Sequence, residues 1–272
     1  MKTFFGALVI ALASSTEAFV SRPSFTSKKT ALAATVAAKP DIALAEKLLC
    51  ANVVAQSVDS TTLAYRTDAY YTGAGFTRDP VICIGGVKNN DCCIVSTIDG
   101  AIVVAYRGTI SAISDWLVDA QVWHKPQAAG KFPGLLHSGF LAATSHVWSK
   151  DAFKNAPLVL TDLLLDMKVP QNYAMDEIKK LQQETGYDKI YITGHSKGAA
   201  MATLGSWFCH VDIGITPECY TFASPYPGNK AFGDAYDAAI TQFSYENYHD
   251  IVCIVPPPDP SYLTDLTEVL AQ

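Results

Sequence analysis

Residues 194–198 form the pentapeptide Gly-His-Ser-Lys-Gly, a G-x-S-x-G pattern whose flanks strongly constrain the local fold. Residues 189–193 before it are mostly β-branched or aromatic and predict a strand. Residues 199–204 after it are small or apolar and predict a helix. A serine between a strand and a helix, with a glycine two positions to either side, indicates a nucleophile elbow, because the turn crowds the backbone. The alternative is an ordinary strand-to-helix loop. We interpret Ser196 as a candidate nucleophile.

A serine hydroxyl needs partners before it can attack an ester. A base must take its proton, an acid must orient that base, and two N–H groups must hold the oxyanion. In proteins with this elbow the chain order is serine, acid, histidine. A strand is expected at residues 242–248, and Asp250 follows it. Asp250 is therefore the candidate acid.

The histidine is the residue that the sequence does not place. The chain has six histidines, and none follows Asp250. His249 is adjacent to Asp250, and neighbours on an extended chain point to opposite faces, so this pair is not expected to form an acid–base dyad. His195 is expected to pack under the elbow. Three explanations stay open: an incomplete chain or gene model, a pseudoenzyme that lacks the base, or a histidine recruited from elsewhere, with His249 as the first candidate.

Four ordered blocks of sequence, within residues 90–258, resemble the class 3, fungal-lipase-like branch of the α/β-hydrolases. The first block matches a strand that ends in R-G-T, followed by W-x-x-D; the others match H-x-G-F, T-G-H-S, and T-F-x-x-P with a later D-x-V. The blocks are residues 103–109 with 115–119, residues 137–140, residues 193–200, and residues 220–229 with 250–257. Four blocks in order are far more specific than the pentapeptide alone.

The resemblance implies an α/β-hydrolase fold, with a mostly parallel central sheet flanked by helices and an incomplete C-terminal part. It implies that Ser196 is the nucleophile and Asp250 the acid of a catalytic triad. Thr109 and Lys197 would supply the oxyanion N–H groups. Residues 110–118 would form a short lid with Trp116 as its apolar anchor, and lid opening at a lipid interface would expose the acyl groove.

Lys197 departs from the family pattern, which has leucine after the nucleophile. The backbone N–H is unaffected by this change. The side chain has two interpretations: an ammonium near the site that favours an anionic or strongly polar head group, or a side chain that points to solvent.

The first 38 residues have the composition of targeting segments. Lys2 precedes a ten-residue apolar run that is too short to span a bilayer, and small residues follow it, so residues 1–18 are predicted to be a signal peptide. Residues 19–38 are rich in hydroxyl groups, basic and free of acidic residues, as transit peptides are. A flexible pro-segment is the alternative. Phe19 after the expected cleavage site resembles the bipartite leader of algae with complex plastids.

The leader implies entry into the secretory pathway and then the plastid, with a secreted, extracellular or endomembrane location as the alternative. Residues 39–272 are predicted to be one class 3 lipase-like domain, with its core motifs in residues 90–258. The chain has a formal charge of −6, and residues 1–38 carry four basic residues and one acidic residue, so the remainder is more acidic still. An acidic domain without a basic run argues against binding to nucleic acids. No transmembrane segment is expected.

The seven cysteines are an odd number, and several lie in apolar strands, which favours buried free thiols over disulfides. No cysteine or histidine spacing fits a zinc site, so no metal and no cofactor are predicted. Helices are expected at residues 41–57, 139–149 and 171–185, and a hairpin at residues 92–106 around Asp99-Gly100. Residues 150–170 are either an insertion that shapes the pocket or a surface excursion.

The resemblance implies a serine carboxylic-ester hydrolase that releases fatty acids from acyl lipids through an acyl-enzyme on Ser196. Triacylglycerol, galactolipid and phospholipid are the candidate substrates, and the lid would contact a lipid interface transiently. The alternative from another functional class is a catalytically silent lipid-binding or regulatory domain without the triad histidine. Acyl transfer to an acceptor other than water uses the same residues.

Overall fold

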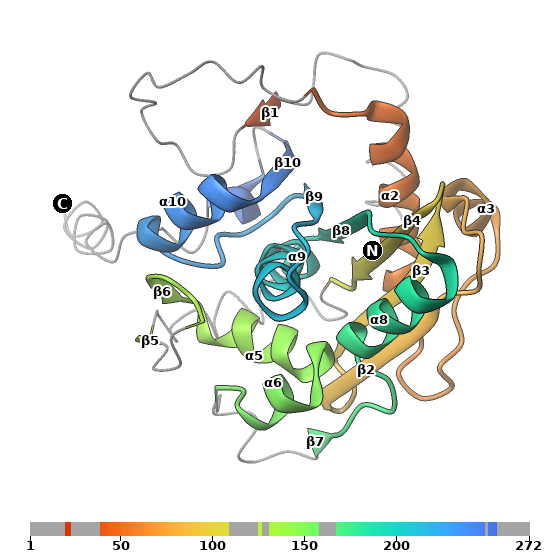
Figure 1. The fold of residues 1–272 in the computed structure, drawn as a ribbon, viewed down its shortest axis with the longest axis horizontal. Helices are drawn as coiled ribbons and strands as arrows, with labels where there is room; N and C mark the ends of the chain where they lie inside the picture. Colours follow the sequence, from red (N-terminus) through yellow and green to blue (C-terminus); the bar gives the residue numbers. More distant parts are fainter. Residues whose placement is uncertain are drawn as a thin grey trace.

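The computed structural model describes residues 20–22, 39–108, 125–126, 131–157, 167–247 and 250–254. Within these ranges the chain forms an eight-stranded sheet with helices on both faces, beside a two-stranded sheet (Figure 1). The small sheet pairs β5 (Lys125–Pro126) with β6 (Leu135–Leu136). Thr109 and Trp116 lie outside the described residues, and so does the predicted lid.

The large sheet has the strand order β1-β10-β9-β8-β4-β3-β2-β7. β4, β8, β9 and β10 are parallel, and the other neighbours are antiparallel. The predicted α/β class is confirmed, but the sheet is mixed rather than mostly parallel. The strands are β1 (Val20–Arg22), β2 (Val81–Val87), β3 (Asp91–Ile98), β4 (Ala101–Tyr106), β7 (Met167–Lys168), β8 (Ile190–His195), β9 (Glu218–Phe222) and β10 (Thr241–Glu246).

Two tight turns join the antiparallel neighbours β2–β3 and β3–β4. Asp99 and Gly100 both have positive φ, as does the pair Lys88 and Asn89. Consecutive residues with positive φ belong to type I′ turns, whose twist matches that of a hairpin. The first pair joins β3 to β4, as the sequence predicts, and the second lies between β2 and β3.

Helices pack on the two faces of the sheet. α2 and α3 contribute to the apolar clusters on one face. α5, α8, α9 and α10 contribute to the cluster on the other, where α9 lies at the centre beside α5 (Figure 1). The helices are α2 (Ile42–Gln56), α3 (Ala69–Ala74), α5 (Ser138–Trp148), α6 (Lys150–Lys154), α8 (Ala174–Thr185), α9 (Lys197–Phe208) and α10 (Lys230–Ala239), with a π-helical turn at Cys209–Ile213 and a 3₁₀ turn at Ile251–Ile254.

β4 shows why both faces need covering. Ile102, Val104 and Tyr106 belong to the cluster under α9, whereas Val103 and Ala105 face α2. Side chains alternate between faces along a strand, so a strand that is apolar throughout is buried on both sides. All six residues of β4 are buried accordingly.

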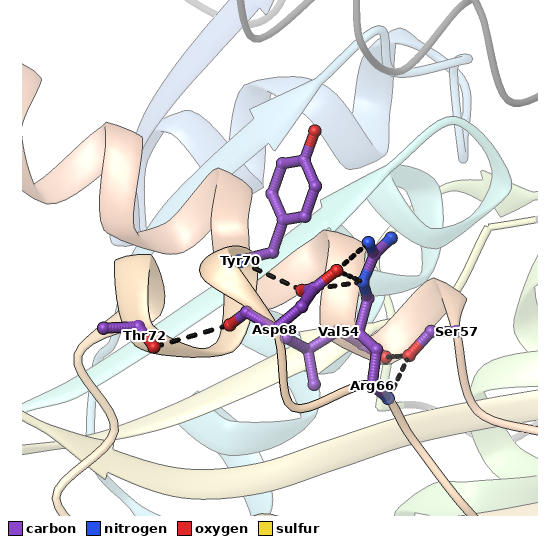
Figure 2. Close-up of polar contacts among 6 residues, drawn as sticks. All are labelled: Val54, Ser57, Arg66, Asp68, Tyr70 and Thr72. Carbon is purple, nitrogen blue, oxygen red and sulfur yellow. Dashed lines mark hydrogen bonds and ion pairs between the residues drawn. The ribbon is translucent and has the colours of Figure 1, made fainter.

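The connection between α2 and α3 is fixed by side-chain hydrogen bonds to the backbone (Figure 2). Ser57 Oγ donates to the carbonyl of Val54 (2.7 Å) and accepts from the N–H of Arg66 (3.0 Å). The Arg66 guanidinium pairs with Asp68, whose carboxylate also caps α3 by accepting from the N–H of Tyr70. These bonds hold a loop in which the carbonyl of Val58 accepts from Arg107, the residue after β4.

The predicted helices at residues 41–57 and 139–149 are confirmed as α2 and α5, with ends that differ by one residue or less. α8 begins at Ala174, three residues later than predicted, and Tyr173 before it has an extended backbone. The Asn172 side chain donates to the carbonyl of Ile82 (3.2 Å). In the 150–170 segment the described parts are α6 and β7, and β7 pairs with β2. All seven cysteines are free thiols, and all but Cys50 are buried. No helix among the described residues is long and apolar enough to cross a bilayer.

Candidate active site

The C-terminal ends of the parallel strands lie at one edge of the sheet. Gly108 follows β4, Ser196 follows β8 and Asp250 follows β10 at this edge. Loops after parallel strands are where α/β proteins place their ligand-binding groups. The topology therefore brings three separate motifs of the sequence to the same edge.

Ser196 has a backbone conformation that serine rarely adopts. Its φ is +57° and its ψ is −128°, outside the regions that L-residues favour. The turn is held by a bond from the Ser196 N–H to the carbonyl of Phe222 (3.0 Å) and by one from the Ala199 N–H to the carbonyl of Ser196 (2.8 Å). A strained conformation persists only where its surroundings enforce it, and such positions cluster at functional sites. The predicted strand–turn–helix geometry is therefore present, with β8 before the serine and α9 after it.

The two glycines of the pentapeptide are required by close backbone contacts. A β-carbon at Gly194 would overlap the carbonyl of Gly198. A β-carbon at Gly198 would overlap the carbonyl of Tyr106, at the end of β4. The glycines thus allow the turn to close on itself and let α9 begin directly against β4.

Lys197 is the first residue of α9. The first N–H groups of a helix have no partner within the helix, and the positive end of the helix dipole lies there. The N–H of Lys197 is therefore chemically suited to hold an oxyanion that forms on an ester bound at Ser196.

The side chain of Lys197 turns into the protein. Lys197 Nζ lies 2.6 Å from Asp91 Oδ1, and the side chain is only 19% exposed. The other oxygen of that carboxylate, Asp91 Oδ2, lies 2.7 Å from His146 Nδ1. The interpretation that Lys197 points to solvent is wrong, because Asp91 offers a buried counter-charge. Because the ammonium is bound to Asp91, it is not placed to bind the head group of a substrate.

Asp91 is ionised in this arrangement. Burial alone would raise its pKa, but the Lys197 charge and the hydrogen bond with His146 outweigh burial and hold the pKa well below its usual range. Asp91 and His146 are both buried. The cluster therefore couples three elements, namely β3, α5 and α9.

Asp250 directly precedes the 3₁₀ turn after β10. Its Oδ1 accepts a hydrogen bond from the N–H of Val252 (3.0 Å), and its carbonyl accepts from the N–H of Cys253 (3.2 Å). The N–H of Asp250 donates to the carbonyl of Asn247 (3.0 Å). These bonds fix the carboxylate at the sheet edge that also carries Ser196.

Arg107 holds the segment that leads to Thr109, and sequence reasoning gave it no role. It is buried, and its guanidinium donates to the carbonyls of Val58 and Asn89 (both 2.8 Å). Its N–H donates to the carbonyl of Cys92 (2.9 Å). The sequence does offer one indication of this role: Arg107 directly follows an apolar strand. A buried charge at such a position needs hydrogen-bond partners.

Three of the four described histidines have hydrogen-bond partners other than Ser196. His146 is bonded to Asp91, and His210 lies 2.9 Å from Thr216 Oγ1. His137 Nδ1 caps α5 by accepting from a backbone N–H. Burial lowers the pKa of His195 to about 4, so its imidazole is neutral at pH 7.

His124 and His249, the other two of the six histidines, lie outside the described residues.

Comparison with known proteins adds a family match. A family model described as Lipase (class 3) matches residues 103–259, more than half of the chain. Phospholipase A1-II 1 of Oryza sativa subsp. indica is 29% identical over 149 residues, which cover 51% of this chain and 34% of that protein. Secreted mono- and diacylglycerol lipase A of Penicillium cyclopium is 28% identical over 158 residues, covering 58% and 44%. The chain thus spans less than half the length of these relatives.

Solved structures show the same fold. The Rhizomucor miehei triacylglyceride lipase superposes with a TM-score of 0.53 at 21% identity, covering 79% of this chain and 73% of that one. The lipase from Rhizopus microsporus var. chinensis superposes with a TM-score of 0.57 at 20% identity, covering 79% and 68%. The predicted α/β-hydrolase fold is confirmed by these likenesses.

Proposed function

This chain belongs to the class 3 lipase family, and from that membership we propose that it is a serine carboxylic-ester hydrolase that acts on acyl lipids. The observation that carries the proposal is the conformation of Ser196, with positive φ between β8 and α9. Gly194 and Gly198 cannot be replaced without backbone overlap, so the turn between them is rigid. In a nucleophile elbow such a turn carries the serine hydroxyl at its tip. The sequence motif and the strained geometry agree on one residue.

In the proposed reaction Ser196 Oγ attacks the carbonyl carbon of the ester while a base removes its proton. The carbonyl π electrons move to the oxygen, which the N–H groups of Lys197 and Thr109 hold. Collapse of this intermediate breaks the bond to the alcohol, which leaves with the proton from the base. Water then attacks the acyl-enzyme by the same steps and releases the fatty acid. Asp250 is proposed to orient the base, and Trp116 to anchor a lid.

The substrate class follows from the family and from its named relatives. A phospholipase A1 and a mono- and diacylglycerol lipase both cleave carboxylic esters of glycerol, which supports acyl glycerolipids as substrates here. Triacylglycerol, galactolipid and phospholipid share that ester chemistry. The Lys197 ammonium is bound by Asp91, so nothing at this residue selects an anionic head group.

The second candidate is a catalytically silent lipid-binding domain. It is favoured by His146 and His210, whose rings are bonded to Asp91 and Thr216 and not to Ser196. Without a base, only the slow catalysis that binding and the oxyanion groups provide would remain. Acyl transfer, the third candidate, would differ only in the acceptor.

Hydrolysis by the purified full chain separates these candidates. We expect turnover of p-nitrophenyl butyrate and tributyrin, and the Ser196→Ala variant should lose at least about 1000-fold in kcat because the nucleophile is absent. Equal turnover by the two proteins would remove Ser196 from the mechanism. With p-nitrophenyl butyrate as the acyl donor and glycerol as the added acceptor, free butyrate indicates hydrolysis and butyrylglycerol indicates transfer.

The location is a separate part of the proposal. Residues 1–38 are proposed to direct the chain into the secretory pathway and then to the plastid. A fluorescent protein fused after residue 38 in an alga with complex plastids should reach the plastid. Fluorescence in the medium or in endomembranes would support the alternative location.

A further inference from the structure

We propose that Asp91 is a positioning residue which, through its ion pair with Lys197, holds the start of α9 so that the Lys197 N–H faces the oxyanion. The inference rests on the proposed function, because it assigns a role within the same site. The backbone N–H of Lys197 would bind the oxyanion, and the ion pair of its side chain with Asp91 would hold that N–H in position.

The ion pair between Lys197 and Asp91 joins elements that are distant in sequence. Asp91 begins β3 and Lys197 begins α9, 106 residues later, and their side chains meet at 2.6 Å. His146, in the last turn of α5, binds the second carboxylate oxygen at 2.7 Å. A carboxylate held on both oxygens cannot rotate away from the ammonium, so the position of Lys197 is tied to β3 and α5.

Space for the carboxylate is reserved in the backbone. Gly86 has a φ of +74°, and a β-carbon there would overlap Asp91 Oδ2 and lie 2.9 Å from His146 Nδ1. The chain therefore has a glycine, with a backbone conformation that other residues rarely adopt, where the ion pair lies. The ion pair therefore lies in the packed interior of the protein and not on its surface.

Residues 89–92, which include Asp91, also bind the segment that packs against the residue before Ser196. The carbonyls of Asn89 and Cys92 accept from Arg107, whose successor Gly108 lies against the elbow. A β-carbon at Gly108 would lie 2.9 Å from the carbonyl of His195. Residues 89–92 are thus hydrogen-bonded to Lys197 through Asp91 and to Arg107, whose neighbour Gly108 packs against His195.

The charges around the pair favour a role in positioning. Asp91 faces Lys197 and His146, with the Cys92 thiol and the Arg107 guanidinium next to them. Burial raises the pKa of the Cys92 thiol to about 12, so the thiol is neutral at pH 7. Asp91 is thus the acidic partner of Lys197, and removal of either charge leaves the other poorly compensated.

The test compares four single variants of the full chain. Lys197→Met removes the ammonium and keeps the backbone N–H, Lys197→Arg keeps a cation, and Asp91→Asn removes the carboxylate charge. Asp234→Asn is the matched control, since it breaks the exposed Lys230–Asp234 pair on α10, which has the same 2.6 Å separation. The measurements are kcat and KM for p-nitrophenyl butyrate, and hydrogen–deuterium exchange of the peptide that spans residues 191–204.

We expect Lys197→Met and Asp91→Asn to lower kcat at least about tenfold with KM within about twofold, because a small displacement of an oxyanion donor acts on the transition state. The 191–204 peptide should exchange at least about threefold faster in both variants, since opening of the helix start exposes its amides. Lys197→Arg should restore both properties to within about threefold of the wild type. Asp234→Asn should change neither.

A folded Lys197→Met variant that keeps either kcat or the exchange rate within about twofold of the wild type overturns the inference. If Asp91→Asn does not fold, Lys197→Met decides, because Asp91 keeps its bond to His146. If the wild type itself shows no turnover, the hydrolase proposal fails, and the exchange rates alone decide the positioning role.

Discussion

Gly198, on the first turn of α9, lies so close to the carbonyl of Tyr106 at the end of β4 that no side chain fits between them. This contact fixes where α9 begins relative to the sheet. It therefore also fixes the turn that carries Ser196.

Replacement of Gly198 by alanine should destabilise the protein strongly. Inside a helix this substitution normally stabilises by about 1 kcal/mol, so a loss would report the backbone overlap. We expect a loss of at least about 3 kcal/mol in urea unfolding, in the range of severe packing defects. The control is Gly100→Ala, where positive φ is the constraint and no atom lies within 4 Å of the added carbon; it should cost about 1 kcal/mol. Equal losses would refute the overlap.

Replacement of Ser196 by glycine should stabilise the protein while it removes ester hydrolysis. Glycine adopts φ of +57° with ψ of −128° far more readily than serine, so we expect a gain of about 1 kcal/mol. Ser196→Ala keeps the β-carbon and should gain much less, although it also lacks the hydroxyl. Thermal unfolding of the three proteins measures the difference. A Ser196→Gly variant less stable than Ser196→Ala would contradict strain at this position.

His195 should make the protein less stable as the pH falls from about 6.5 to about 4. Burial lowers the pKa of its imidazole to about 4, whereas an unfolded histidine titrates near pH 6.5. Between these values the unfolded chain binds the extra proton, so stability decreases with acidification, by on the order of 2 kcal/mol. His195→Gln cannot ionise and should lack this slope in urea unfolding at pH 7, 5.5 and 4. If His195→Gln showed the same dependence of unfolding free energy on pH as the wild type, the imidazole of His195 would be solvated in the folded protein.

Arg107→Met should destabilise the protein by about 2–4 kcal/mol, because the carbonyls of Val58 and Asn89 would lose their buried donor. Arg107→Lys should recover part of this loss, since an ammonium can reach one carbonyl but lacks the planar fork for both. Urea unfolding of the two variants provides the measurement. Equal stability of Arg107→Met and the wild type would show that the guanidinium bonds are not needed.

Local sequence signals predicted the elements that depend on neighbouring residues. The hairpin at Asp99-Gly100 follows from the preference of those two residues for positive φ. The elbow follows from two glycines around Ser196 between a strand and a helix. In both cases the residues that set the conformation lie within a few positions of one another.

The remaining parts depend on contacts between distant residues. Nothing near Lys197 in the sequence indicates a counter-charge, because Asp91 lies 106 residues earlier. The role of Arg107 depends on backbone carbonyls, which carry no sequence signature. Two of the antiparallel pairings that make the sheet mixed, β2 with β7 and β1 with β10, also join distant residues.

The central claim is that Ser196 is an activated nucleophile, and covalent labelling tests it most directly. The full chain would be incubated with a fluorophosphonate, which reacts with serine hydroxyls only when they are activated, and the adduct mapped by peptide mass spectrometry. Our account predicts one adduct per chain, on Ser196, that is absent after heat denaturation and in Ser196→Ala. A folded wild-type chain that acquires no adduct on Ser196 would contradict the account and favour the silent lipid-binding domain.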